Sequence, residues 1–128
     1  MQVIRSGEVA EEWTTRDDID GEQATRHLVS RALTGTEHLV VDVARFPPGF
    51  THHLHRHFEA DQLLIAVDGP FTVLHPDGDE RLEAGDVAVF PRGDWHGARN
   101  DTDETVQALV LFSGVGELVE AGYEESTR

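Results

Sequence analysis

Short apolar segments, separated by clusters of turn-forming residues, recur along most of this chain of 128 residues. The separators are Thr-Gly-Thr, Pro-Pro-Gly, Asp-Gly-Pro, Pro-Asp-Gly-Asp, Ala-Gly-Asp and Asn-Asp-Thr-Asp. Gly, Pro, Asn and Asp favour tight turns, and short strands at regular intervals are typical of a β-sandwich or a β-barrel. The sequence therefore predicts an all-β fold.

A chain of this length fits a single domain, and most of it reads as strand. Residues 1–23 are polar and charged, and we expect them to form an arm or an edge segment. Residues 24–114 are expected to form the barrel, and residues 115–128 a tail with one short helix at 116–122. The segments with strand character are 27–33, 38–46, 51–57, 62–67, 71–75, 81–83, 87–90 and 105–112.

One stretch places two histidines on alternate residues of an expected strand. Gly49 is followed at set intervals by His55, His57, Gln62 and Gly69. Because alternate strand residues point to the same side, the imidazoles of His55 and His57 are expected to project into one space. Two imidazoles held in this way form half of a transition-metal site, and Gln62 offers a neutral oxygen from the next segment.

A second stretch supplies a third histidine. Gly85, Pro91, Gly93, His96 and Asn100 follow one another at set intervals, and His96 comes after a Pro-x-Gly turn that can direct it toward the same point. Metal sites that carry out chemistry keep a coordination position open for water or substrate. Four protein ligands leave such a position on a metal that takes five or six ligands.

The two stretches resemble the sequence motifs of the cupin family, G-x5-H-x-H-x4-E-x6-G and G-x5-P-x-G-x2-H-x3-N. The second motif matches at every position, and the first departs only at Gln62, where the family usually has Glu. The resemblance covers residues 49–100 and implies a cupin-type β-barrel, a double-stranded β-helix or jelly roll. It also implies a homodimer and a divalent transition metal (Zn, Fe, Ni or Mn). The metal ligands that it implies are His55, His57, Gln62 and His96.

His53 and His55 offer an alternative pair of ligands to His55 and His57. His53 shares the strand parity of His55, and His52 lies beside it, so a direct role for either stays open. The count of five residues from the first glycine of the motif selects His55 and His57 instead. His53 is then expected at the rim of the site.

The fourth ligand has alternatives too, because Glu59 and Asp61 lie close to Gln62 and either could supply a carboxylate. Gln62 is favoured, since it keeps both spacings of the first motif. Three imidazoles and an amide leave the full charge on a divalent metal, whereas a carboxylate would cancel half of it. A more positive metal polarises a bound carbonyl more strongly and lowers the pKa of bound water further. The glutamine therefore favours Lewis-acid chemistry or binding over manganese-dependent oxidation.

The resemblance implies a metal-dependent enzyme that acts on a small organic molecule by Lewis-acid or oxygen-activating chemistry, of the isomerase, lyase or dioxygenase type. The alternative is a non-catalytic cupin that binds or senses a small ligand, because the expected last strand carries no ionisable side chain. The candidates for proton transfer or for holding a substrate carboxylate are Glu59, Asp61 and Arg92. The expected pocket residues, chosen by strand parity or by their place in the turn before His96, are Leu64, Ala66, Trp95 and Ala98.

Composition limits the partners. The formal net charge is −15 and all ten basic residues are Arg, which argues against nucleic acid and anionic membranes because both require cationic patches. Whether this acidity reflects adaptation to concentrated salt or a coding bias stays open. The absence of cysteine excludes disulfides and thiolate ligands. No stretch reads as a signal peptide or a membrane span, so a cytoplasmic protein is expected.

Overall fold

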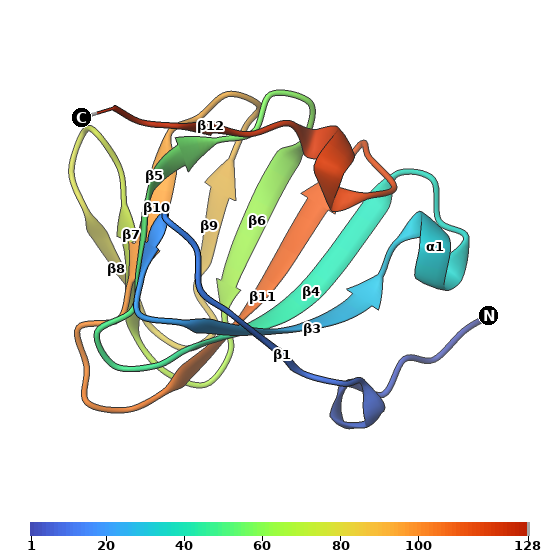
Figure 1. Cartoon of the computed structure of the whole chain (residues 1–128), viewed down its shortest axis with the longest axis horizontal. Helices are drawn as coiled ribbons and strands as arrows, with labels where there is room; N and C mark the ends of the chain where they lie inside the picture. The colour runs from blue at the N-terminus through green and yellow to red at the C-terminus, as the bar shows by residue number, and fades with distance from the viewer. Residues whose placement is uncertain (128) are drawn as a thin grey trace.

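The computed structural model describes residues 1–127 and consists of two antiparallel β-sheets that face each other (Figure 1). This arrangement confirms the all-β, cupin-type barrel that the sequence predicts. The strands of the first sheet, in spatial order, are β1 (Glu12–Thr14), β3 (Gln23–Val29), β4 (Leu39–Phe46), β11 (Val106–Ser113), β6 (Asp61–Ala66) and β9 (Val87–Phe90).

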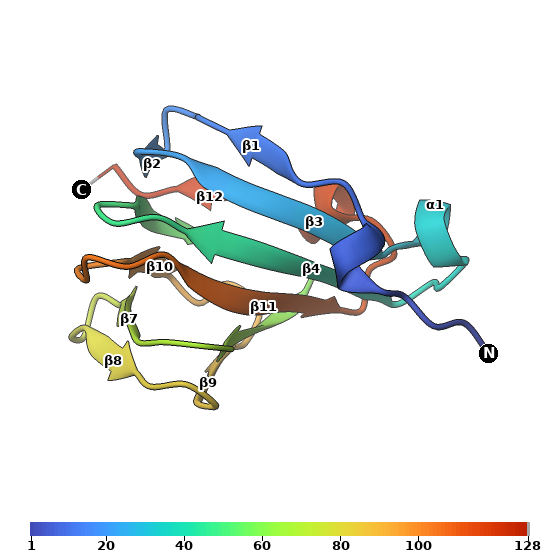
Figure 2. The same cartoon turned by 90° about the horizontal axis from the view of Figure 1, so that it is seen from below.

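The second sheet is built around β5, which pairs with β10 on one side and with both β2 and β12 on the other. The strands β2 and β12, which share this edge of β5, come from opposite ends of the chain. Figure 2 shows the molecule from below, with β1, β3, β4 and β11 of the first sheet side by side in that order. The strands of this sheet are β12 (Glu124–Glu125), β5 (Thr51–Arg56), β10 (His96–Arg99), β7 (Phe71–Leu74), β8 (Glu80–Leu82) and, on β5, β2 (Ile19–Asp20).

Strict alternation of burial along β4 and β6 decides which side chains face the interior. Along β6 the inward positions are Gln62, Leu64 and Ala66, because successive strand residues point to opposite faces. Leu64 and Ala66 belong to the apolar core, whereas Gln62 is a buried polar residue at the start of the strand. The apolar core therefore fills one end of the barrel and leaves polar groups at the other.

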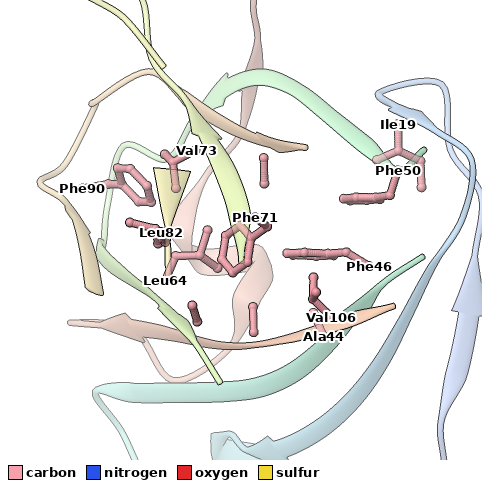
Figure 3. Close-up of a cluster of buried hydrophobic side chains, with 13 residues drawn as sticks. Ile19, Ala44, Phe46, Phe50, Leu64, Phe71, Val73, Leu82, Phe90 and Val106 are labelled. Carbon is pink, nitrogen blue, oxygen red and sulfur yellow. The ribbon is translucent and has the colours of Figure 1, made fainter. Parts of the chain in front are cut away.

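Aromatic side chains form the centre of this core (Figure 3). Phe46 stacks on Phe50 with ring centroids 4.5 Å apart and meets the edge of Phe71 at 5.4 Å. Such offset and edge-to-face contacts add to the free energy gained from burying the rings. A smaller cluster under the C-terminal segment contains Val40, Ala60, Phe112, Val115 and Ala121.

Three short helical turns complete the part of the chain that the structure describes: η1 (Ser6–Glu8), α1 (Arg31–Thr34) and η2 (Leu118–Ala121). The last of these confirms the short helix expected at 116–122. The strand expected over 27–33 is wrong beyond Val29, since Ser30 caps α1 by accepting a hydrogen bond from the Leu33 amide. Residues 12–14 and 19–20, in the expected arm, form strands at the sheet edges.

Strand β10 was not expected as a strand, and it depends on close backbone contact. A bulge between His96 and Ala98 interrupts its pairing with β5. A Cβ atom on the intervening Gly97 would overlap with the backbone carbonyl oxygen of His52, so only glycine allows the two strands to approach this closely. The strand ends at Arg99, and the buried side-chain amide of the next residue, Asn100, donates hydrogen bonds to the carbonyl oxygen of Phe46 at 2.7 Å and to that of Glu104.

Within residues 1–127 no helix is long and apolar enough to cross a membrane.

The contact at Gly97 predicts a large effect of one methyl group. We expect Gly97→Ala to lower the free energy of unfolding by about 1–3 kcal/mol, because the strands must separate to accept the Cβ atom. Urea unfolding followed by circular dichroism measures this. Gly7→Ala is the matched control, since within residues 1–127 no heavy atom beyond its chain neighbours lies within 4 Å of a Cβ atom at Gly7. Equal stability of the two variants would contradict the account of the bulge.

Candidate metal centre

The three histidines of the two motifs lie on neighbouring strands of the second sheet. His55 is on β5, His57 follows its last residue, and His96 begins β10 directly opposite His55. One nitrogen of each imidazole lies within 4.8 Å of the corresponding nitrogen of the other two. The register of β5 and β10 therefore brings together residues that are about 40 positions apart in the sequence.

Backbone carbonyl groups fix the orientation of all three imidazoles. The Nδ1 atoms of His55, His57 and His96 lie 2.8 Å, 2.7 Å and 2.9 Å from the carbonyl oxygens of His53, Gly122 and Asp94. A carbonyl oxygen only accepts, so each Nδ1 carries the hydrogen and each neutral ring keeps its lone pair on Nε2. Metal-binding histidines commonly have such partners, which set the tautomer and the direction of the ring.

Within residues 1–127, two buried polar atoms at this point have no hydrogen-bond partner: Nε2 of His96 and Oε1 of Gln62. Both residues are more than 90% buried, and an unpaired acceptor in such a place is costly. Both atoms carry lone pairs, and nitrogen and oxygen donors of this kind are ligands for a divalent transition metal. The residues present therefore fit a metal ion.

Burial keeps these imidazoles neutral. It lowers the pKa of His96 to about 4 and moves the pKa of His55 far below its ordinary value, with further lowering from the neighbouring histidines. The pKa of His57 is lowered for the same reason, although its hydrogen bond to Gly122 works in the other direction. At neutral pH the lone pairs are thus free of protons, as metal binding requires.

Ring contacts hold the imidazoles in place. His96 stacks on Phe90 with centroids 4.0 Å apart, and His57 meets the edge of Phe112 at 5.0 Å. His55 stacks on His52 at 3.8 Å. Since each ring is fixed by a hydrogen bond and by several ring contacts, little side-chain entropy remains to be lost when a ligand binds.

The histidines open onto a cavity of about 610 Å³ inside the barrel, within the usual size range of small-molecule sites. Its wall is largely apolar beside the histidines and polar where β3 and residues 14–16 contribute. The C-terminal segment, with η2 and β12, crosses one end of the barrel (Figure 1) and lines the cavity with Val119 and Tyr123. The apolar side chains of the wall include Leu64, Ala98, Val110 and Phe112.

A network around Asp18 was missed by the sequence analysis. Its carboxylate accepts hydrogen bonds from Arg16 at 2.9 Å, from His52 at 3.0 Å and from the hydroxyl of Tyr123. Burial opposes ionisation of Asp18, but these donors outweigh it and lower its pKa. Burial and the bond to Asp18 raise the pKa of Tyr123, and burial lowers the pKa of His52 to about 4. A protonated phenol therefore stands beside the histidine cluster, with its ring centroid 5.3 Å from that of His55.

No local sequence pattern indicated this network, because Asp18 and Tyr123 lie near opposite ends of the chain. The signals available were that Tyr123 is the one tyrosine of the sequence and that His52 adjoins the motif. Of the two extra histidines left open, His52 lines the cavity. His53 is exposed, and its Nε2 lies 3.1 Å from a carboxylate oxygen of Asp20 instead.

The expected pocket residues divide into two groups. Leu64 and Ala98 line the cavity. Ala66 lies in the apolar core, one inward position further along β6. Trp95 lies outside the cavity, in a separate hollow with Leu54, and its ring packs under the guanidinium of Arg56 at 4.7 Å.

The charged candidates also lie outside the cavity. Glu59 and Arg92 border a separate surface hollow. Asp61 is exposed and accepts a hydrogen bond from the Arg92 amide at 3.0 Å, whereas Gln62, its neighbour on β6, is buried and lines the cavity. The two residues point to opposite faces of the sheet, as strand geometry requires, and this favours Gln62 as the fourth ligand.

Comparison with known proteins agrees with this fold. A family model of the cupin domain (Cupin_2) matches residues 42–112. Two germin-like proteins of Oryza sativa subsp. japonica are 35% and 33% identical over 72 and 75 residues, or 52% and 55% of this chain. These matches span only about a third of each relative, 34% and 35%.

Two solved structures share the fold at low sequence identity. The polyketide cyclase RemF from Streptomyces resistomycificus matches with a TM-score of 0.83 at 19% identity, covering 100% of this chain and 87% of its own. A predicted oxalate decarboxylase from Thermotoga maritima matches with a TM-score of 0.81 at 23% identity, covering 89% of this chain and 100% of its own. Because the family model covers more than half of the sequence, the chain belongs to the cupin family.

Proposed function

We propose that this cupin is a metal-dependent enzyme that acts on a small organic molecule. Its divalent metal would be held by Nε2 of His55, His57 and His96 and by Oε1 of Gln62. The observation that carries the proposal is the pair of buried lone pairs without partners, on His96 and Gln62, at the wall of a cavity that can hold a ligand. When bound, the metal would supply Lewis-acid chemistry at a substrate oxygen, or oxygen activation if it is iron.

The protein's own groups prepare this chemistry. Gln62 adds no negative charge, so the site would keep the polarising power of a divalent ion. Leu64, Val110 and Phe112 give one wall an apolar surface that excludes water and strengthens electrostatic interactions inside. Tyr123 holds a proton on its hydroxyl beside the histidines, with Asp18 fixing its direction.

The names of similar structures support an enzymatic role in general terms. One of them is described as a polyketide cyclase and another as a predicted oxalate decarboxylase. Neither identifies the reaction of this chain, and the choice among isomerase, lyase and dioxygenase chemistry belongs to this proposal. The homodimer and the identity of the metal stay predictions from the family resemblance.

One observation favours the alternative of a non-catalytic cupin that binds or senses a ligand. The candidates for proton transfer in the sequence, Glu59 and Asp61, do not reach the cavity. Assays of carbonyl conversion, sugar-acid conversion and oxygen consumption on the metal-loaded protein separate the two functions. Turnover in any of them supports the enzyme. Silence in all of them, together with tight retention of a ligand, supports the binder.

Removal of one imidazole tests the metal site. We expect His57→Ala to weaken zinc binding by more than about 100-fold, because loss of an outer partner alone costs 10–100-fold. Competition with a chromogenic chelator measures the affinity, and circular dichroism verifies the fold. His38→Ala is the matched control, since His38 is exposed and lies outside the cavity. Unchanged zinc affinity in His57→Ala would contradict the assignment.

A second pair of variants tests the fourth ligand. Gln62→Glu should keep the metal and raise the affinity for manganese relative to zinc, because a carboxylate suits manganese and lowers the net charge of the site. Asp61→Ala should leave both affinities unchanged, since Asp61 lies outside the cavity. Titration with each metal in turn gives the ratio. If Asp61→Ala abolishes binding and Gln62→Glu changes nothing, Asp61 is the ligand.

A further inference from the structure

The cavity has a second polar group, on the sheet opposite the histidine cluster. Asp42 on β4 is 94% buried as a residue, lines the cavity and pairs with His27 on β3, with Oδ1 3.0 Å from Nδ1. The other ring nitrogen of His27 lies 3.2 Å from an oxygen of Glu12 at the sheet edge. None of these residues takes part in the metal site proposed above.

Strand register gives the approximate separation between Asp42 and Gln62, the candidate metal ligand on the same sheet. Leu64 pairs with Val110, and Val110 pairs with Asp42, so Asp42 lies two strands away from Leu64 across one face of the sheet. Neighbouring strands are about 4.8 Å apart, which places Asp42 on the order of 10 Å from Leu64 and Gln62. Between the two ends the cavity wall is formed by the apolar side chains of Leu64, Val110 and Phe112.

The carboxylate of Asp42 can accept a further hydrogen bond. Within residues 1–127 no hydrogen bond involves the second carboxylate oxygen of Asp42, Oδ2, and this atom is not sealed inside the protein. Burial raises the pKa of Asp42 although His27 acts against it, because the carboxylate lacks part of its normal solvation. A donor from a ligand would replace that missing solvation.

The negative charge around Asp42 favours a ligand group that donates a hydrogen bond over a ligand carboxylate. Asp42 and Glu12 together outnumber the single positive charge that His27 can carry, and the whole chain is strongly acidic. The guanidinium of Arg16, also in the cavity wall, is already paired with Asp18. A ligand carboxylate at Asp42 would therefore be repelled, whereas a hydroxyl would be held.

We propose that Asp42 and His27 form a distal binding site for a hydrogen-bond donor, such as an alcohol or phenol hydroxyl. The preferred ligand is then an elongated, largely apolar molecule with a metal-binding oxygen at one end and a hydroxyl about 10 Å away at the other. The inference rests on the proposed function, since the first end needs the metal.

The test uses zinc-loaded protein and three hydroxamic acids with the same eight-carbon chain, ending in a methyl group, a hydroxyl or a carboxylate. The hydroxamate binds the metal, and the chain reaches the distal site. By calorimetry we expect the hydroxyl probe to bind roughly tenfold more tightly than the methyl probe, as a hydrogen bond to a charged group allows. The carboxylate probe should bind more weakly than both. The same three end groups on a four-carbon chain should show no such differences.

Asp42→Asn should remove the penalty of the carboxylate probe and reduce the preference for the hydroxyl probe. Asp103→Asn is the matched control, because Asp103 is exposed, lies outside the cavity and loses the same charge. If Asp42→Asn does not fold, the comparison of the three probes on the wild-type protein still tests the distal site.

The outcomes distinguish failure of the distal site from failure of the metal site. Equal binding of the three long probes by zinc-loaded protein overturns the distal site and leaves the metal site intact. Binding of the methyl probe that is the same with and without zinc overturns both.

Discussion

Hydrogen bonds from three imidazoles to backbone carbonyl oxygens determine what this barrel can bind. They place the hydrogen of His55, His57 and His96 on Nδ1 and leave Nε2 free to accept. The carbonyls belong to a strand, to the turn before β10 and to the C-terminal segment. The candidate site is therefore ordered by the fold itself and needs no charged partner for the histidines.

The terminal segments do more than cover the barrel. Gly122 supplies the carbonyl oxygen for His57, and Tyr123, the next residue, reaches Asp18 near the other end of the chain. Both termini thereby enclose the cavity, and each contributes polar groups to it. A ligand would meet the histidine cluster on one side and polar residues of β3 and β4 on the other, with an apolar wall between them. Such a cavity suits an amphipathic molecule better than a fully polar one.

The sequence predicted the fold and the three histidines because both follow from local patterns. Strand alternation brings His55 and His57 to one side, and the glycine and proline spacing directs His96. Strand β10 escaped prediction because His-Gly-Ala-Arg has little β-propensity and is held by pairing on both sides. The Asp18–Tyr123 contact joins residues 105 positions apart, so only the tertiary structure shows it.

The metal content of the protein tests the central claim most directly. Untagged protein, purified without chelators or metal columns, would be measured by mass spectrometry for zinc, iron, nickel and manganese. The account predicts close to one divalent ion per chain, or uptake of one ion on reconstitution, with loss in the His57→Ala variant. A protein that holds no metal and takes up none would contradict it, because the lone pairs of His96 and Gln62 would then have no metal ion to bind.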